Sequence, residues 1–112
     1  MAIRMTKAWW PLTVQGIDRL AGHMGVYQLG DGQGRVLYIG VASGRSRFGL
    51  RGELQPHVAA PPAGAAQYRV EVTTAYLTRW QELLMVHVAD FGHVPVHNTA
   101  GDAAGIGRLS PA

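Results

Sequence analysis

The sequence predicts an α+β protein in which helices flank a small central antiparallel β-sheet. Two β-rich runs separated by a Gly-rich loop indicate a β-hairpin at residues 24–40. A later segment, residues 75–91, places apolar side chains at helical spacing. The chain has 112 residues, 47% of them hydrophobic and 15% charged, which is enough for one hydrophobic core. We therefore expect one globular domain.

Residues 1–22 are expected to form an arm and a short helix that pack on this domain. Trp9 and Trp10 are too apolar to be left in water. Thr13 is a plausible N-cap for a helix over residues 13–21, and the chain before that helix is expected to be irregular.

The predicted hairpin joins residues 24–29 to residues 35–40 across the loop 31–34. A loop of two or four residues places Tyr27 opposite Tyr38, whereas a three-residue loop gives another register. Two facing tyrosines between glycines would present two hydroxyl groups at an open surface. The alternative is an ordinary aromatic pair that packs under a helix.

The middle of the chain predicts a loop, a helix and a second β-rich element. We expect a loop at residues 41–46 and a helix over about 47–58, which Pro61 and Pro62 must end. Residues 68–73 alternate apolar with polar side chains, which is typical of a half-buried strand.

The C-terminal part predicts a long amphipathic helix and a short strand. Thr74 is placed to cap the helix over residues 75–91, and Gly92 to end it. Residues 94–98 are expected to form a final strand or extended edge, and residues 100–112, rich in Gly and Ala, a flexible tail.

Composition excludes several classes of protein. The chain has no cysteine, which excludes disulfide frameworks, thiol catalysis, iron–sulfur clusters and the usual structural zinc sites, and fits a cytoplasmic location. No run of about 18 apolar residues indicates a membrane span, and no apolar run at the N-terminus indicates a signal peptide. We expect no membrane partner.

Basic residues concentrate in one stretch of the chain. The net charge is +3, and residues 32–52 contain no acidic side chain. This stretch holds four arginines, whose planar guanidinium groups fit phosphate: Arg35, Arg45, Arg47 and Arg51. The charge alone fits a polyanion partner, but an ordinary solvated surface accounts for it at least as well.

Two triplets give the chain a resemblance to a known family. Gly25-Val26-Tyr27 is followed, after ten residues, by Tyr38-Ile39-Gly40. This pair resembles the motifs of the GIY-YIG nuclease family, with Val26 where Ile is usual. The resemblance covers roughly residues 23–98 and implies a nuclease domain over residues 23–99. After the second triplet the family has an arginine on a helix, then a glutamate and finally an asparagine near the end of the domain. The corresponding residues here are Arg51, Glu82 and Asn98.

The resemblance implies a divalent-metal-dependent endonuclease that hydrolyses DNA phosphodiester bonds. Tyr27 is then the candidate base, Tyr38 positions the phosphate or the attacking water, and Arg51 clamps phosphate. Glu82 is the candidate ligand for Mg²⁺ or Mn²⁺, because magnesium can bind through a single carboxylate and water. For Glu82 the alternative is a helix glutamate that pairs with Arg79.

The resemblance gives further residues alternative roles. Arg47 is the alternative family arginine, and with Arg35 and Arg45 it is a candidate DNA contact. His57 is either a proton relay or a surface histidine near the end of a helix. Asn98 resembles the terminal asparagine of the family, which either takes part in catalysis or substrate binding or ties the last segment to the active-site face.

Three further histidines have no compact ligand spacing, so incidental placement is favoured over a zinc site: His87, His93 and His97. The second functional hypothesis is a non-catalytic nucleic-acid-binding module with the same fold, and a third is a structural domain without a nucleic-acid partner. RNA remains an alternative substrate. Targeting would then depend on a homodimer, a separate targeting protein or the structure of the DNA.

Overall fold

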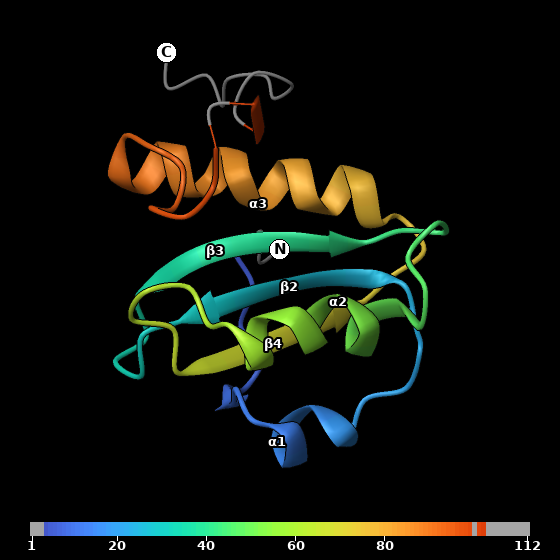
Figure 1. The fold of residues 1–112 in the computed structure, drawn as a ribbon. Coiled ribbons are helices and arrows are strands. Elements are labelled where there is room, and N and C mark those ends of the chain that lie inside the picture. The colour runs from blue at the N-terminus through green and yellow to red at the C-terminus, as the bar shows by residue number, and fades with distance from the viewer. Residues whose placement is uncertain (1–3, 100, 103–112) are drawn as a thin grey trace.

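The computed structural model describes residues 4–99, 101 and 102, and it confirms the α+β fold. Four antiparallel strands form one sheet in the order β1-β4-β2-β3. Helix α3 lies over one face of this sheet, and α1 and α2 lie over the other (Figure 1). The elements are β1 (Trp10–Pro11), α1 (Val14–Asp18), β2 (Gly25–Gly30), β3 (Val36–Ala42), α2 (Gly49–Ala59), β4 (Gln67–Val72) and α3 (Tyr76–Phe91).

The N-terminal arm is partly regular, which corrects the expectation of an irregular segment. Trp10 pairs with Tyr68 and so forms the two-residue edge strand β1 along β4. The guanidinium of Arg19 lies 3.8 Å from the ring centroid of Trp10, and that of Arg69 lies 4.2 Å from the ring of Trp9. Cation–π contacts of this kind hold both indoles against the domain, as expected from their apolar character.

Helix α1 is shorter than predicted, although its predicted start is confirmed. The Thr13 hydroxyl accepts a hydrogen bond from the Gly16 backbone N–H at 2.9 Å. The helix ends at Asp18 rather than residue 21. Ile17 and Leu20 nevertheless lie in the same core as the sheet, so this segment packs on the domain.

The hairpin register differs from the one that places Tyr27 opposite Tyr38. Tyr27 pairs with Gly40, and Tyr38 pairs with Leu29. The Asp31 carboxylate accepts hydrogen bonds from backbone N–H groups in the turn, which produces a three-residue loop, and a bulge follows between Leu29 and Gly30. Because these two changes add up to a shift of two residues, the tyrosines keep a common sheet face.

The glycine opposite Tyr27 has a steric reason. A Cβ atom at Gly40 would overlap the ring of Tyr27. The bare backbone of Gly40 therefore lets the Tyr27 ring lie across β3 toward Tyr38, whose ring centroid is 6.0 Å away.

Helix α2 starts two residues later than predicted. Phe48, its N-cap, has φ 62° in the left-handed region, which turns the chain after the loop into the helix. The predicted end is nearly right, since α2 ends at Ala59. Leu50 and Leu54 are buried against the sheet, and this orientation fixes which other side chains of α2 meet the strands.

Helix α3 closely follows its prediction, except for its cap. Thr74 does not cap the helix; the Thr73 hydroxyl instead accepts a hydrogen bond from the Ala75 N–H at 3.1 Å. Gly92 ends the helix with φ 83°, as predicted. Of the helices in the part of the chain that the structure describes, none is long and apolar enough to cross a membrane.

The segment after α3 is not the predicted strand: residues 94 and 95 have no regular structure, residues 96 and 97 form a turn, and residue 98 is a bend. Its proline lacks an N–H group for pairing. The segment still joins β3, since the His97 N–H donates to the Leu37 carbonyl at 3.0 Å. The predicted tail lies outside the described residues apart from Gly101 and Asp102.

Candidate functional site

Three aromatic side chains from β2, β3 and α2 meet on the α2 face of the sheet. The Tyr27 hydroxyl is 3.0 Å from Nε2 of His57. The ring centroid of His57 is 5.7 Å from that of Tyr27 and 5.5 Å from that of Tyr38. The structure thus brings together both motif tyrosines and His57, which we call the tyrosine–histidine cluster.

The protonation states of this cluster follow from its burial. Burial strongly raises the pKa of Tyr27, so the side chain is a protonated phenol at neutral pH. Burial lowers the pKa of His57 below 6.5, which favours the neutral ring. In the tautomer of the neutral ring that carries its hydrogen on Nδ1, Nε2 accepts the hydrogen bond from the Tyr27 hydroxyl. An easily ionised Tyr27, which the role of base requires, is not what this environment favours.

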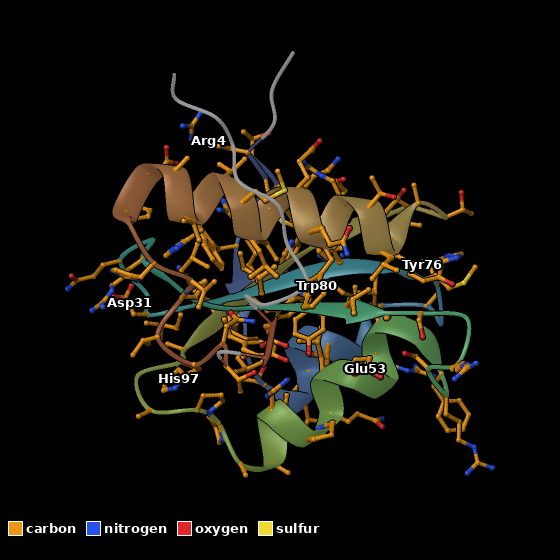
Figure 2. All side chains as sticks on the ribbon, turned by 90° about the horizontal axis from the view of Figure 1, so that it is seen from above. Arg4, Asp31, Glu53, Tyr76, Trp80 and His97 are labelled. Atoms are coloured by element: carbon orange, nitrogen blue, oxygen red, sulfur yellow. The ribbon has the colours of Figure 1, made fainter. Side chains whose placement is uncertain are left out.

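Two carboxylates, those of Glu53 and Asp102, affect the pKa values of the tyrosines in the cluster. Glu53 lies on α2 (Figure 2), one helical turn before His57 and thus on the same side of the helix. Its negative charge contributes to the raised pKa of both Tyr27 and Tyr38. Asp102 contributes to the raised pKa of Tyr38, after burial as the main cause. The cluster is therefore a region of negative charge.

Asn98 ties the C-terminal segment to the strand beside the cluster. Its Oδ1 accepts from the Ile39 N–H at 2.9 Å, and its Nδ2 donates to the Ile39 carbonyl at 3.0 Å. Nδ2 also donates to the Asp102 carboxylate at 3.1 Å. The predicted tying role of Asn98 is thus visible in its contacts, which are with backbone and Asp102.

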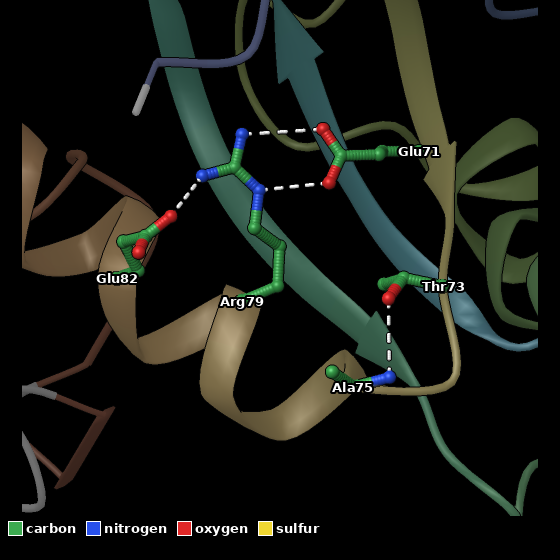
Figure 3. Close-up of polar contacts among 5 residues, drawn as sticks. All are labelled: Glu71, Thr73, Ala75, Arg79 and Glu82. Atoms are coloured by element: carbon green, nitrogen blue, oxygen red, sulfur yellow. Dashed lines mark hydrogen bonds and ion pairs between the residues drawn. The ribbon is translucent and has the colours of Figure 1, made fainter. Parts of the chain in front are cut away.

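Glu82 lies apart from the cluster, on α3 over the opposite face of the sheet. Arg79 holds it in an ion pair and also binds Glu71 of β4, with Nε donating to Oε2 at 2.8 Å (Figure 3). These hydrogen bonds raise the pKa of Arg79, first through Glu71. The structure shows the pairing of Glu82 with Arg79 and does not bring Glu82 to the tyrosines.

The predicted phosphate-binding arginines do not form one patch. Arg45 and Arg47 are exposed in the loop between β3 and α2. Arg35 lies before the other end of β3, about 23 Å away along a seven-residue strand. Arg51 lies in α2 but is turned about 120° from His57 around the helix axis. Its Nε atom is buried without a hydrogen-bond partner among the described residues.

Three of the histidines outside the cluster each bond a backbone carbonyl. Nδ1 of His87 is 2.7 Å from the carbonyl oxygen of His93, Nδ1 of His93 is 2.8 Å from that of Val94, and Nε2 of His97 is 2.8 Å from that of Ala63. Within residues 4–99, 101 and 102, no three His, Asp or Glu side chains gather in an arrangement that could hold a metal.

A magnesium ion nevertheless needs only one or two protein carboxylates, with water and substrate phosphate as the other ligands. Glu82 does not fit this role at the cluster because of its position on α3. Glu53 does fit, since it lies beside the cluster. Sequence reasoning missed Glu53, although its spacing of four residues before His57 in a predicted helix was a usable signal.

Fold and cluster together define a small α+β protein with a tyrosine–histidine site between a sheet and a helix. Residues 3–90 match the model of a family described as Domain of unknown function (DUF7508), and the chain belongs to this family. The match includes Tyr27, Tyr38, Glu53 and His57. No curated protein matches the chain.

Proposed function

We propose that this protein is a divalent-metal-dependent endonuclease that hydrolyses DNA phosphodiester bonds at the tyrosine–histidine cluster. The observation that carries the proposal is the hydrogen bond between Tyr27 and the neutral His57, beside Tyr38. A buried phenol bonded to a neutral imidazole is a ready proton relay. The resemblance of the two triplets to the GIY-YIG nucleases supports the same reaction.

Proton transfer in this site can run from water through Tyr27 to His57. The water oxygen bonds to phosphorus as the bond from phosphorus to the leaving oxygen breaks, and the leaving oxygen takes a proton from solvent. The proton of the attacking water passes to the Tyr27 oxygen while the Tyr27 proton passes to Nε2 of His57 in the tautomer that carries its hydrogen on Nδ1. Because both transfers occur together, the high pKa of Tyr27 is no obstacle. Tyr38 positions the phosphate or the water through its hydroxyl group.

The negative charge around the cluster supports metal dependence. Glu53 and Asp102 would repel a phosphodiester unless a cation lay between them and the substrate. Glu53 would hold Mg²⁺ or Mn²⁺ together with water. The bound ion would neutralise the charge that develops on the phosphate oxygens.

DNA would bind mainly through its backbone. The exposed Arg45 and Arg47, in the loop before α2, are proposed phosphate contacts. Arg51 lies off the cluster, so we do not place it on the scissile phosphate. The absence of cysteine fits a cytoplasmic enzyme.

A non-catalytic nucleic-acid-binding module is the second candidate. The position of Glu82 favours it, because the carboxylate that the resemblance assigns to the metal is held by Arg79 instead. A binder of this kind would show salt-dependent DNA binding without cleavage.

Nicking of supercoiled plasmid by the purified protein tests the proposal. With Mg²⁺ or Mn²⁺ the wild type should nick, with EDTA it should not, and Tyr27→Phe and His57→Gln should each lose at least about a hundredfold in rate. Tyr76→Phe and His23→Gln are matched controls outside the cluster and should keep the wild-type rate. DNA binding without nicking of plasmid, single-stranded or branched DNA would favour the binding module.

A further inference from the structure

Two adjoining pockets lie on the α3 face of the sheet, opposite the tyrosine–histidine cluster. Their volumes are about 210 and 390 Å³, and both are lined by Val36, His87 and Phe91. The larger one lies between the β2–β3 loop, the end of α3 and the segment that follows it. Its volume is within the range of small-molecule sites.

One wall of the larger pocket is aromatic and exposed. Phe91 is 64% exposed and Val96 60% exposed, although both line this pocket. The ring centroid of Phe91 is 4.6 Å from that of the buried His87. An exposed phenylalanine ring beside a pocket offers a stacking surface for a planar ligand.

The polar wall favours an anion. Arg35 lines the pocket with an exposed guanidinium group, and Gln33 lies beside it. The nearest carboxylate in the adjoining pocket, that of Asp90, is neutralised by Arg4, whose Nε donates to Oδ2 at 2.8 Å. The Asp31 carboxylate bonds the backbone N–H of Arg35, and the charge of Arg35 helps to lower its pKa. Arg35 forms no ion pair among the described residues, however, so its guanidinium can still pair with a ligand.

His87 adds a hydrogen-bond acceptor, and its contacts determine which of its two ring nitrogens accepts. Its Nδ1 lies 2.7 Å from the carbonyl oxygen of His93, and a carbonyl only accepts, so Nδ1 carries the hydrogen. Burial lowers the pKa of His87, which keeps the ring neutral. His87 lines the pocket, and its Nε2, which has no bonded partner in the described chain, is the ring nitrogen left to accept an amino or imino hydrogen.

We propose that this pocket is a second binding site, for a nucleoside monophosphate. The base stacks on Phe91, the phosphate pairs with Arg35, and an amino or imino group of the base donates to Nε2 of His87. The site is separate from the proposed nuclease centre, since the sheet lies between them. It can therefore stand or fall independently of the proposed function.

Chemical-shift mapping of the ¹⁵N-labelled full chain with AMP tests this site. AMP should give saturable shifts at the backbone amides around Gly34, Val36 and Phe91. Adenosine and inorganic phosphate, titrated separately, should each bind at least about tenfold more weakly, because each lacks one of the two contacts.

Two pairs of variants locate the contacts. Phe91→Ala and Arg35→Gln should each weaken AMP binding by about tenfold or more. Phe48→Ala, which alters a phenylalanine 62% exposed, and Arg45→Gln are matched controls away from the pocket and should bind AMP as the wild type does.

Three results would overturn the proposal. They are the absence of saturable shifts at millimolar AMP, equal binding of phosphate alone, and shifts centred on Tyr27 and His57 instead of the pocket. Plasmid nicking by Phe91→Ala should proceed at the wild-type rate. Failure of AMP to bind would then leave the proposed nuclease activity unaffected.

Discussion

A single amide side chain completes the edge of the sheet beside the proposed active site. Asn98 bonds both the N–H and the carbonyl of Ile39, as a neighbouring strand would. The Ile39 carbonyl also accepts from Nε1 of Trp80 at 3.0 Å, whereas its N–H has Asn98 as partner. The Ile39 N–H therefore depends on Asn98 more than the Ile39 carbonyl does.

Replacing Asn98 with alanine should destabilise the fold. The Ile39 N–H would lose its acceptor in a part-buried position, which costs about 1–3 kcal/mol. Urea denaturation of Asn98→Ala measures the change in free energy of unfolding. Gln55→Ala, an exposed amide on α2, is the control and should change it by no more than about 0.5 kcal/mol. Equal values for the two variants would contradict this role of Asn98.

At the scale of elements, helix α3 shows why some boundaries are predictable. Its apolar periodicity and Gly92 are local features of the sequence, and they place the helix to within one residue. The two-residue strand β1 and the turn at residues 96–97 depend instead on which sheet edges are left open, which local sequence does not show. The register of β2 on β3 depends on the Asp31 side chain and a bulge.

Gly92 provides a test of the helix end. Its φ of 83° favours glycine, and a Cβ atom there would meet nothing within 4 Å, so substitution isolates the backbone effect. Gly92→Ala should lower the free energy of unfolding by about 1 kcal/mol, and Gly92→Asn by less, because asparagine tolerates this conformation. Thermal and urea denaturation of both variants measure this order, and the reverse order would contradict it.

The candidate site, like the helix boundaries, was predictable only where it depends on local sequence. The two triplets place Tyr27 and Tyr38 on adjacent strands, and a two-residue error in register leaves them on one face. Glu82 was expected with them, but the sheet face on which α3 packs is set by tertiary structure. Glu53 belongs to no motif, and its spacing of four residues before His57 was its only signal in the sequence, because the packing of α2 decides which of its side chains meet the tyrosines.

At the scale of the molecule, the sheet separates two regions of different chemistry. One face carries the tyrosine–histidine cluster with Glu53, and the other carries the pocket with His87 and Arg35. Each face also holds a histidine, the half-buried His57 and the buried His87, whose pKa lies below the ordinary 6.5 with burial as the main cause. Both histidines thus resist protonation in the folded state.

This arrangement predicts that stability falls in mild acid. Because His57 and His87 bind protons more readily when unfolded, the unfolded state takes up more protons once the pH drops below about 6.5. The free energy of unfolding should therefore be lower at pH 5.5 than at pH 7.5. The pKa of Asp90 is lowered by Arg4 from 3.8, so its titration lies below this window. Urea denaturation across the range would contradict the account if stability were flat or rose toward pH 5.5.

The central claim is that catalysis belongs to the face of the sheet that carries Glu53 and not to Glu82. The most direct measurement is the rate of Mg²⁺-dependent plasmid nicking by Glu53→Gln beside that by Glu82→Gln. The account predicts at least a roughly hundredfold loss for Glu53→Gln and a rate close to wild type for Glu82→Gln. Loss in Glu82→Gln with full activity in Glu53→Gln would contradict it.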